Sequence, residues 1–597
     1  MSESTGPRRI YSILAAVALL LVFGGGFLAF ETQTAGGTIK IRDIRFVGTN
    51  GTIMSALLYI PKGVTAKTPA PGIVAIHGYI NSRETQDGFA IEFARRGYVV
   101  LALDQTGHGY SDPPAFANGF GGPDGLKYLR SLDIVDPTNI GLEGHSMGGW
   151  ASLAAAATYP DQYQSIVLAG SSTGAPFAKE GTATWPRNLG LIYSQWDEFS
   201  SLMWNSPTGK AIVNTDKLKA VFGTTDPVVV GKLYGSIADG TARKLYQPAG
   251  THPNDHISTE AIGYAMEWMQ ATLKGGNNLP ASDQIWYWKE IGTFIALIGM
   301  ILFLFPLGAL LIQTSVFQDL VSPVPVLKGL SGRGWLIGAA AGLLIPAITY
   351  FWLQNEGNTL FPAGSFWPQT ITTGVVAWAV GNAVISLVLF LVWHFRSNRA
   401  SGGTAENYGL TWNGRIDFGK IAKSFVLAVC IVGAGYLLLL ASDALFKTDF
   451  RLWVLAIKPM SSLQFQIALA YLLPFVLYSL VIGIVLNGQL RQVKADGTPV
   501  GLARTLLTNA VIMAGGIVLL LLFLYIPLMA GGAFEPTESL LAIVAFQFVP
   551  LLAILSLITT YFFRKTGHIY VGAFVCALFI TWVIVAGQAI QFGFPGT

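Results

Sequence analysis

Long apolar segments are distributed unevenly along the chain. One lies near the N-terminus, at Ile10–Phe30, and carries no charged residue. The others follow residue 290, at Ile291–Ile312, Trp335–Leu353, Ile371–Trp393, Phe425–Ser442, Phe465–Leu486, Ala510–Met529, Leu540–Phe562 and Ile569–Ile590. A helix needs about 20 apolar residues to cross a bilayer, and these segments are of that order. The sequence therefore predicts an N-terminal anchor helix within 1–31 and a bundle of about eight membrane helices within 283–597.

The stretch between these parts, 32–282, follows a different pattern. Short β-rich apolar runs occur at Ile39–Val47, Ile53–Ile60, Gly72–His77, Tyr98–Leu103, Ile140–Glu143, Ser165–Ala169, Leu189–Tyr193 and Lys244–Gln247. Helical patterns occur at Thr85–Arg96, Gly122–Leu132, Met147–Tyr159 and Thr259–Leu273. Strands that alternate with helices indicate an α/β domain in which a mostly parallel sheet is covered on both faces.

Composition agrees with this division and excludes several classes of protein. Hydrophobic residues make up 52% of the chain and charged residues only 12%, whereas soluble domains contain about 25% charged residues. The net charge of +4 is small, and no dense run of Lys and Arg suggests a nucleic-acid partner. Cys430 and Cys576 both lie in apolar runs, so they indicate neither a disulfide framework nor a metal cluster. We expect no cofactor.

The basic residues of the loops predict an orientation in the membrane. If the N-terminus is cytoplasmic, alternate loops carry Arg8, Arg9, Lys328, Arg333, Arg396, Arg399, Arg415, Lys420, Lys423, Arg491, Lys494, Arg504, Arg564 and Lys565 on that side. The opposite side of the bundle carries only Lys289, Lys447, Arg451 and Lys458. Because cytoplasmic loops are enriched in Lys and Arg, we expect a multi-pass cell-membrane protein whose α/β domain is extracytoplasmic.

The most specific motif of the α/β domain is Gly-His-Ser-Met-Gly-Gly at residues 144–149. It follows an apolar strand and opens an Ala-rich helix, as a G-x-S-x-G nucleophile elbow requires. The strained turn needs small residues two before and two after the serine. It also directs the N-terminus of the helix at the reacting centre. Ser146 is therefore the candidate nucleophile, and the backbone N–H of Met147 is a candidate oxyanion donor.

A second motif, His-Gly-Tyr at 77–79, follows another apolar strand. A loop in this position can supply the other oxyanion donor, here the N–H of Tyr79. We interpret His77, Asp104 and His108 as structural residues of the nearby loops. Together these motifs resemble the α/β-hydrolase superfamily over roughly residues 40–275, and most closely its esterase, lipase and peptidase-like members. The bundle resembles no family that we recognise.

The resemblance implies a catalytic triad in the chain order serine, acid, histidine. Of the seven histidines, His77, His108 and His145 precede the serine, and His394 and His568 lie at the ends of membrane segments. His252 and His256 are left as candidate bases. His252 is favoured, because the family's histidine follows the last strand and His252 lies five residues after Gln247.

Two turns could supply the acid. The apolar strand Leu189–Tyr193 leads to Asp197, about 55 residues before His252, which is a long interval for the family but leaves room for an insert at 198–243. The run Leu218–Phe222, taken as a less apolar strand, leads to Asp226 at a more usual spacing. We favour Asp197, with Asp226 as the alternative.

These residues predict a membrane-embedded serine hydrolase that cleaves a small-molecule or lipid-like carboxylic ester through an acyl-enzyme. The same triad could serve a peptidase, an amidase or an acyltransferase. A ligand-binding domain of a transporter or receptor is the alternative without catalysis. Irregularly spaced aromatic residues of the insert and its surroundings, Phe177, Trp185, Phe199, Trp204 and Phe222 among them, could line an acyl pocket, contact the membrane or simply pack on the core.

Overall fold

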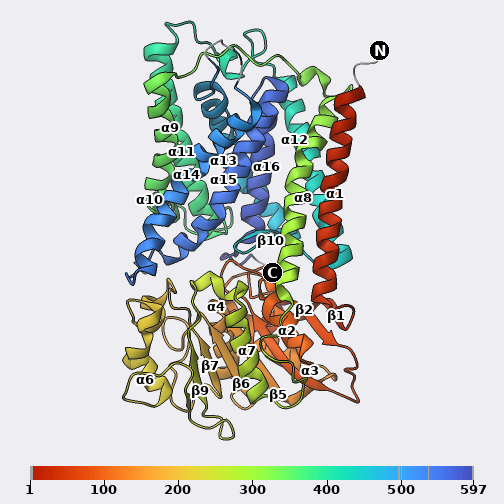
Figure 1. Cartoon of the computed structure of the whole chain (residues 1–597), viewed down its shortest axis with the longest axis vertical. Coiled ribbons are helices and arrows are strands. Elements are labelled where there is room, and N and C mark those ends of the chain that lie inside the picture. Colours follow the sequence, from red (N-terminus) through yellow and green to blue (C-terminus); the bar gives the residue numbers. More distant parts are fainter. Residues whose placement is uncertain (1–4, 495–497, 499, 536, 595–597) are drawn as a thin grey trace.

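The computed structural model describes residues 5–494, 498, 500–535 and 537–594. A helical bundle stands on an α/β domain, with the N-terminal end of α1 (Thr5–Gln33) at the far end of the bundle (Figure 1). Helix α1 packs along α8 (Trp286–Ile312), which leads the chain back into the bundle. Glycines permit this close contact, since a Cβ on Gly25 would lie 2.5 Å from the carbonyl oxygen of Gly292.

The α/β domain is built on a nine-stranded sheet of order β1-β2-β4-β3-β5-β6-β7-β9-β8. Its strands are β1 (Ile39–Val47), β2 (Ile53–Pro61), β3 (Ala70–Ile76), β4 (Val99–Leu103), β5 (Val135–His145), β6 (Ser165–Ala169), β7 (Leu189–Ile192), β8 (Leu233–Tyr234) and β9 (Arg243–Tyr246). The six strands from β4 to β9 in this order are parallel, while β1, β2 and β8 pair antiparallel at the edges. The expected α/β fold with a mostly parallel sheet is confirmed.

Helices cover both faces of the sheet. Helices α3 (Gly122–Ser131) and α4 (Met147–Thr158) contribute to one apolar core, and α2 (Asp87–Arg95) and α7 (Thr259–Thr272) contribute to a second one. The segment after β7 holds α5 (Ser200–Trp204), a 3₁₀ turn (Gly209–Asn214) and α6 (Asp216–Phe222). The loops after β5, β7 and β9 meet at one edge, because parallel strands end at the same edge of a sheet.

The bundle contains, among the described residues, helices that are long and apolar enough to cross a membrane. With α1 and α8, these are α11 (Thr370–Trp393), α12 (Phe418–Phe446), α13 (Ser462–Ile484), α14 (Leu502–Met529), α15 (Ser539–Thr566) and α16 (Tyr570–Gly587). A bent pair, α9 (Gly332–Ile348) and α10 (Tyr350–Leu360), makes an angle of 53° and could form one more span. Pro346 lies just before this bend, where its missing N–H weakens the helix. The orientation in a membrane stays a prediction.

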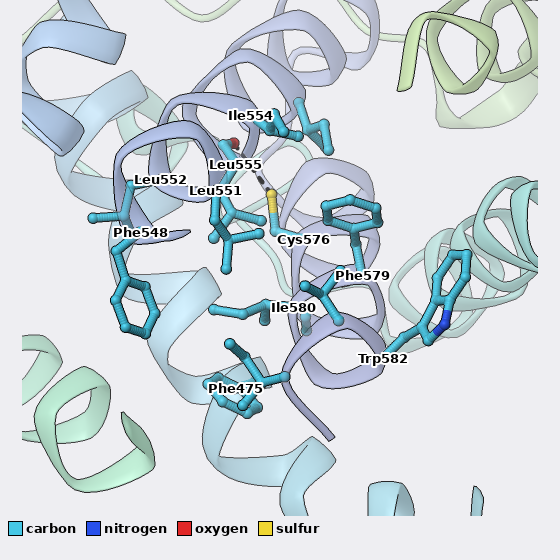
Figure 2. Packing of buried hydrophobic residues seen from close by; sticks show 14 of the residues in the cluster. Phe475, Phe548, Leu551, Leu552, Ile554, Leu555, Cys576, Phe579, Ile580 and Trp582 are labelled. Atoms are coloured by element: carbon cyan, nitrogen blue, oxygen red, sulfur yellow. Dashed lines mark hydrogen bonds between the residues drawn. The ribbon is translucent and has the colours of Figure 1, made fainter. Parts of the chain in front are cut away.

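Helices α15 and α16 form the centre of the bundle. In their most apolar windows 72% and 89% of the residues are buried, against 28–50% in the other single spans. Figure 2 shows apolar side chains of α15, among them Leu551 and Leu555, next to Cys576 and Ile580 of α16. The Cys576 thiol donates a 3.2 Å hydrogen bond to the Leu555 carbonyl oxygen. These two helices therefore form the most tightly enclosed part of the bundle.

A short hairpin, which the sequence pattern did not reveal, joins α12 to α13. Its strands are β10 (Phe450–Leu452) and β11 (Leu455–Ile457). The Arg451 guanidinium donates a 2.9 Å hydrogen bond to the Thr85 hydroxyl, and the Trp453 indole N–H donates one of 3.1 Å to the Pro253 carbonyl oxygen. The hairpin thus docks on the α/β domain, and Arg451 is a buried interface residue.

Candidate active site

Ser146 occupies a sharp turn between β5 and α4. Its backbone has φ 55° and ψ −122°, a conformation that residues other than glycine rarely adopt. A Cβ on Gly144 would lie 2.1 Å from the Gly148 carbonyl oxygen, and one on Gly148 would lie 2.0 Å from the Ile76 carbonyl oxygen. The flanking glycines are therefore sterically required, and the local geometry is that of a nucleophile elbow.

The two residues expected to supply the oxyanion donors lie beside this serine. Met147 is the first residue of α4, so its N–H belongs to the unpaired donors at the start of a helix. Gly78 comes so close to the elbow that a Cβ on it would lie 3.0 Å from the Cβ of Ser146. Tyr79 follows directly, and both Tyr79 and Met147 line the same cavity as Ser146.

His252 and Asp197 are in direct contact. The Nδ1–H of His252 donates a 2.8 Å hydrogen bond to Oδ2 of Asp197. The other carboxylate oxygen of Asp197 accepts from the Phe199 N–H at 2.8 Å and from the Tyr193 hydroxyl at 3.2 Å. Burial alone would lower the pKa of His252, but the negative charge and hydrogen bond of Asp197 outweigh burial and raise this pKa above its usual value. This arrangement suits a base that must become an imidazolium.

Glu198 is a second carboxylate at this histidine, which the sequence pattern did not indicate. It accepts 2.7 Å hydrogen bonds from the backbone N–H of His252 and from the hydroxyl of Tyr525 in α14. Burial, reinforced by the neighbouring Asp197, raises the pKa of Glu198 to about 7. Its position next to Asp197 was the only local signal, since its partners are far away in the sequence.

The alternative acid, Asp226, lies elsewhere. The run Leu218–Phe222 before it was expected to be a strand, and this expectation is wrong, because the run belongs to helix α6. Thr215 caps that helix by accepting from the Leu218 N–H, and Gly223 ends it in a left-handed conformation. Asp226 is exposed beyond the helix, while the contact with His252 is made by Asp197.

The alternative base, His256, is buried beside the site. Its ring centroid lies 3.9 Å from that of His145, and burial lowers its pKa to about 3. The pKa of His145 is also lowered by burial, and its Nε2 shares a 2.9 Å hydrogen bond with the His252 carbonyl oxygen. Two neutral imidazoles therefore pack against the segment that holds His252.

The three residues interpreted as structural form hydrogen bonds with nearby strands and loops. His77 shares a 2.7 Å hydrogen bond with the Gly78 carbonyl oxygen, and its Nε2 accepts from the Gln105 N–H. His108 shares one of 2.9 Å with the Thr106 carbonyl oxygen. Asp104 accepts from the Arg83 N–H and from the Ser55 hydroxyl. These bonds order the loops around Tyr79.

Ser146 and His252 open into one cavity of about 320 Å³ between the α/β domain and the bundle. Its α/β wall includes Phe199, Met203 and Trp150. Its bundle wall combines residues of α8, of the β10–β11 hairpin, of α15 and of α16, namely Glu290, Arg451, Trp453, Val454, Ala456, Lys458, Leu540, Ile543, Val544, Gln547, Val583 and Gly587. The candidate active site is therefore shared by the two parts of the chain. Across the described ranges, no three His, Cys, Asp or Glu side chains are grouped so as to hold a metal ion.

Comparisons with known proteins concern the α/β domain. Residues 71–200 match the family model described as the alpha/beta hydrolase fold. A monoacylglycerol lipase of Mycolicibacterium smegmatis is 33% identical over 120 residues, which cover 19% of this chain and 41% of the lipase. A 2-hydroxy-6-oxononadienedioate/2-hydroxy-6-oxononatrienedioate hydrolase of Cupriavidus pinatubonensis is 36% identical over 80 residues, 13% of this chain and 28% of that enzyme.

Among solved structures, the esterase Pf2001 of Pyrococcus furiosus is 15% identical to this chain. The match covers 40% of this chain and 94% of the esterase chain, with a TM-score of 0.30. The chain spans less than half the length of the curated relatives that it matches. The matched residues 71–200 include Ser146, Asp197 and Glu198 but end before His252. The α/β domain thus has the alpha/beta hydrolase fold, and the chain joins it to a helical bundle.

Proposed function

We propose that this protein is a serine hydrolase that cleaves carboxylic esters at the boundary between its α/β domain and its bundle. The observation that carries the proposal is the 2.8 Å contact between His252 and Asp197 in a cavity that Ser146 also lines. A strained serine after β5, an acid after β7 and a base after β9 are the parts that acyl transfer needs. A ligand-binding domain would have no use for this combination.

The geometry supports a two-step reaction. The Ser146 hydroxyl attacks the ester carbonyl while His252 takes its proton, and the N–H groups of Tyr79 and Met147 stabilise the oxyanion. Collapse of the tetrahedral intermediate expels the alcohol, which receives that proton from His252, and leaves an acyl-enzyme. Water then attacks the acyl-enzyme with His252 again as the base, so that a carboxylic acid is released and Ser146 recovers its proton. Asp197 holds the imidazole and stabilises its charged form.

The surroundings of the cavity support a lipid-like ester as substrate. Phe116, Phe177 and Leu202 line the cavity and are nevertheless 41%, 53% and 37% exposed, so apolar side chains flank its opening. Beside the β10–β11 hairpin, the bundle side of the cavity is formed by helices that are apolar enough to cross a membrane. A substrate with an apolar chain and an ester group at the membrane surface fits this arrangement, with the membrane as its source.

Turnover of an activated ester by the full-length protein in detergent or nanodiscs tests the proposal. We expect Ser146→Ala to abolish turnover and Asp197→Asn to lower kcat by about 10⁴, as the loss of the orienting acid does in other triads. Asp226→Asn is the matched control, since that carboxylate is exposed, and it should keep the wild-type rate. Wild-type turnover by the Ser146 variant, or equal losses in the two aspartate variants, would contradict the proposal.

A further inference from the structure

We propose that the apolar chain of the ester binds against the ends of α15 and α16 that face the α/β domain. The bundle then supplies the chain-binding subsite of the hydrolase. This inference rests on the proposed function, because it concerns the same cavity and defines the class of ester that enters it. It also gives the bundle a role beyond anchoring the catalytic domain.

One face of α15 forms the apolar wall. Leu540, Ile543 and Val544 line the cavity, and their spacing of three and four residues places them on one side of the helix. Ile543 is only 8% exposed and Val544 only 1%. Val583 of α16 extends this wall, and Phe199 and Met203 face the same cavity from the α/β domain. An alkyl chain is the ligand chemistry that such a lining favours.

Polar residues limit where this chain can lie. Gln547, one turn further along the same face of α15, ends the apolar wall with a side-chain amide. The hairpin adds the charged residues Arg451 and Lys458, which are 3% and 6% exposed. An alkyl chain gains nothing from these groups and would hinder their solvation. The alkyl chain of the ester therefore lies between Leu540 and Gln547. The cavity volume of about 320 Å³ favours an alkyl chain of short to medium length.

The test compares chain-length profiles of subsite variants. Two substrate series are used: 4-nitrophenyl esters of increasing acyl length, and acetate esters of alcohols of increasing length. They distinguish an acyl chain from an alcohol chain in the subsite. Val544→Phe and Val583→Phe should move the optimum to shorter chains and lower kcat/KM for the longest ester roughly tenfold, as the loss of about two buried methylenes would. Val544→Ala should move the optimum the other way.

Leu519→Phe is the matched control, because this side chain of α14 is 51% exposed on the outside of the bundle. Labelling of Ser146 by a fluorophosphonate checks that each variant keeps a folded site. A shift in either series supports the subsite. The subsite would be overturned if Val544→Phe, Val583→Phe and Val544→Ala all kept the wild-type chain-length profiles in both series while Ser146 was still labelled. Wild-type protein without Ser146-dependent labelling would instead contradict the proposed function.

A different observation carries a second inference: we infer that Tyr525 of α14 is a positioning residue for His252, acting through Glu198. The Tyr525 hydroxyl donates to one carboxylate oxygen of Glu198, and the His252 N–H donates to the other, each at 2.7 Å. The hydroxyl of Ser539, which begins α15, donates a 2.7 Å hydrogen bond to the Glu198 carbonyl oxygen. Two bundle helices therefore hold the turn that contacts both members of the acid–base pair.

Burial makes this connection rigid. Glu198 is 1% and Tyr525 is 7% exposed, so the hydrogen bonds lie where water cannot replace them readily. Loss of the Tyr525 hydroxyl would leave one oxygen of a buried carboxylate without its donor, a change that costs more than an exposed hydrogen bond. The Glu198 side chain would then shift or take up a proton, and the His252 backbone would lose its fixed partner.

Tyr525→Phe tests this inference on the full-length protein. We expect kcat to fall about tenfold with little change in KM, because the variant misplaces the base and leaves the chain-binding wall intact. Tyr471→Phe is the matched control, since its hydroxyl bonds to Gln369 and Thr373 within the bundle. An unchanged kcat for Tyr525→Phe, or an equal fall in the control, would overturn the inference. A variant that loses activity through misfolding would also have a clearly lower Tm in detergent. Ser539→Ala, which removes the neighbouring hydrogen bond to Glu198, then decides by the same split between kcat and KM.

Discussion

The side-chain amide of Gln591 donates a 2.6 Å hydrogen bond to the hydroxyl of Tyr79. Gln591 follows the last helix of the bundle, and its side-chain oxygen accepts a 2.9 Å hydrogen bond from the Thr370 N–H at the start of α11. The segment after α16 is thereby connected both to the bundle and to the loop that is proposed to supply an oxyanion donor. The bundle contacts the candidate oxyanion loop, the acid turn and the histidine loop.

This contact gives a first prediction. Gln591→Leu removes the hydrogen bond to Tyr79, so the oxyanion loop should be held less firmly and kcat should fall about fivefold, which corresponds to a net hydrogen bond of about 1 kcal/mol. Steady-state kinetics on an activated ester measure the effect. Gln313→Leu, at the end of α8, changes the same residue type far from the site and should leave kcat at the wild-type value.

The elbow gives a second prediction. Gly148→Ala would place a Cβ 2.0 Å from the Ile76 carbonyl oxygen, a backbone atom that cannot move away. We expect this variant to lose both activity and thermal stability. Gly433→Ala, in α12, places its Cβ where no atom lies within 4 Å, so it should preserve both and could stabilise its helix by about 0.5–1 kcal/mol. Melting curves in detergent and ester turnover are the two measurements. Equal behaviour of the two alanine variants would be inconsistent with a strained elbow.

The pH dependence of kcat/KM is a third prediction. His252 must be neutral to act as a base. Burial opposes its charged form, but Asp197, Glu198 and Asp255 together favour that form more strongly, so the pKa of His252 is raised. Activity should therefore rise with pH along a limb whose midpoint lies above 6.5, the usual value for histidine. Burial raises the pKa of Asp255 to about 8 and that of Glu198 to about 7, so the limb should be broader than a single titration. A limb centred below 6.5 would contradict the charge environment that we describe.

Comparison of the sequence with the structure shows where local patterns suffice. The elbow was predictable because its constraint is local: Gly144, Ser146 and Gly148 occupy a single turn. Asp197 and His252 could be placed after strands that the apolar pattern revealed. Glu198 could not be selected, because its partner Tyr525 lies 327 residues away and no periodicity connects them. The hairpin β10–β11 was missed for a similar reason, since it is ordered by contacts with the α/β domain.

The interface between the two parts gives a fourth prediction. Lys289 of α8 forms a 2.6 Å ion pair with Asp87 of α2, and both side chains are at most 2% exposed. Asp87→Asn would leave a buried ammonium with only its longer 3.4 Å contact to Glu290, and breaking a buried pair typically costs about 3–5 kcal/mol. The Tm should therefore fall clearly. Asp283→Asn is the control, because Asp283 pairs with Arg95 while 47% exposed, and such pairs contribute less than about 1 kcal/mol. Equal losses of Tm in the two variants would mean that the buried pair does not stabilise the interface.

Covalent labelling tests the central claim most directly. The purified full-length protein is treated with a fluorophosphonate, digested, and examined by mass spectrometry for the modified peptide. The account predicts one stoichiometric adduct on Ser146, abolished in Ser146→Ala and strongly slowed in His252→Asn, because the base activates the nucleophile. Absence of an adduct on a folded protein, or an adduct on another residue that persists in Ser146→Ala, would contradict the account.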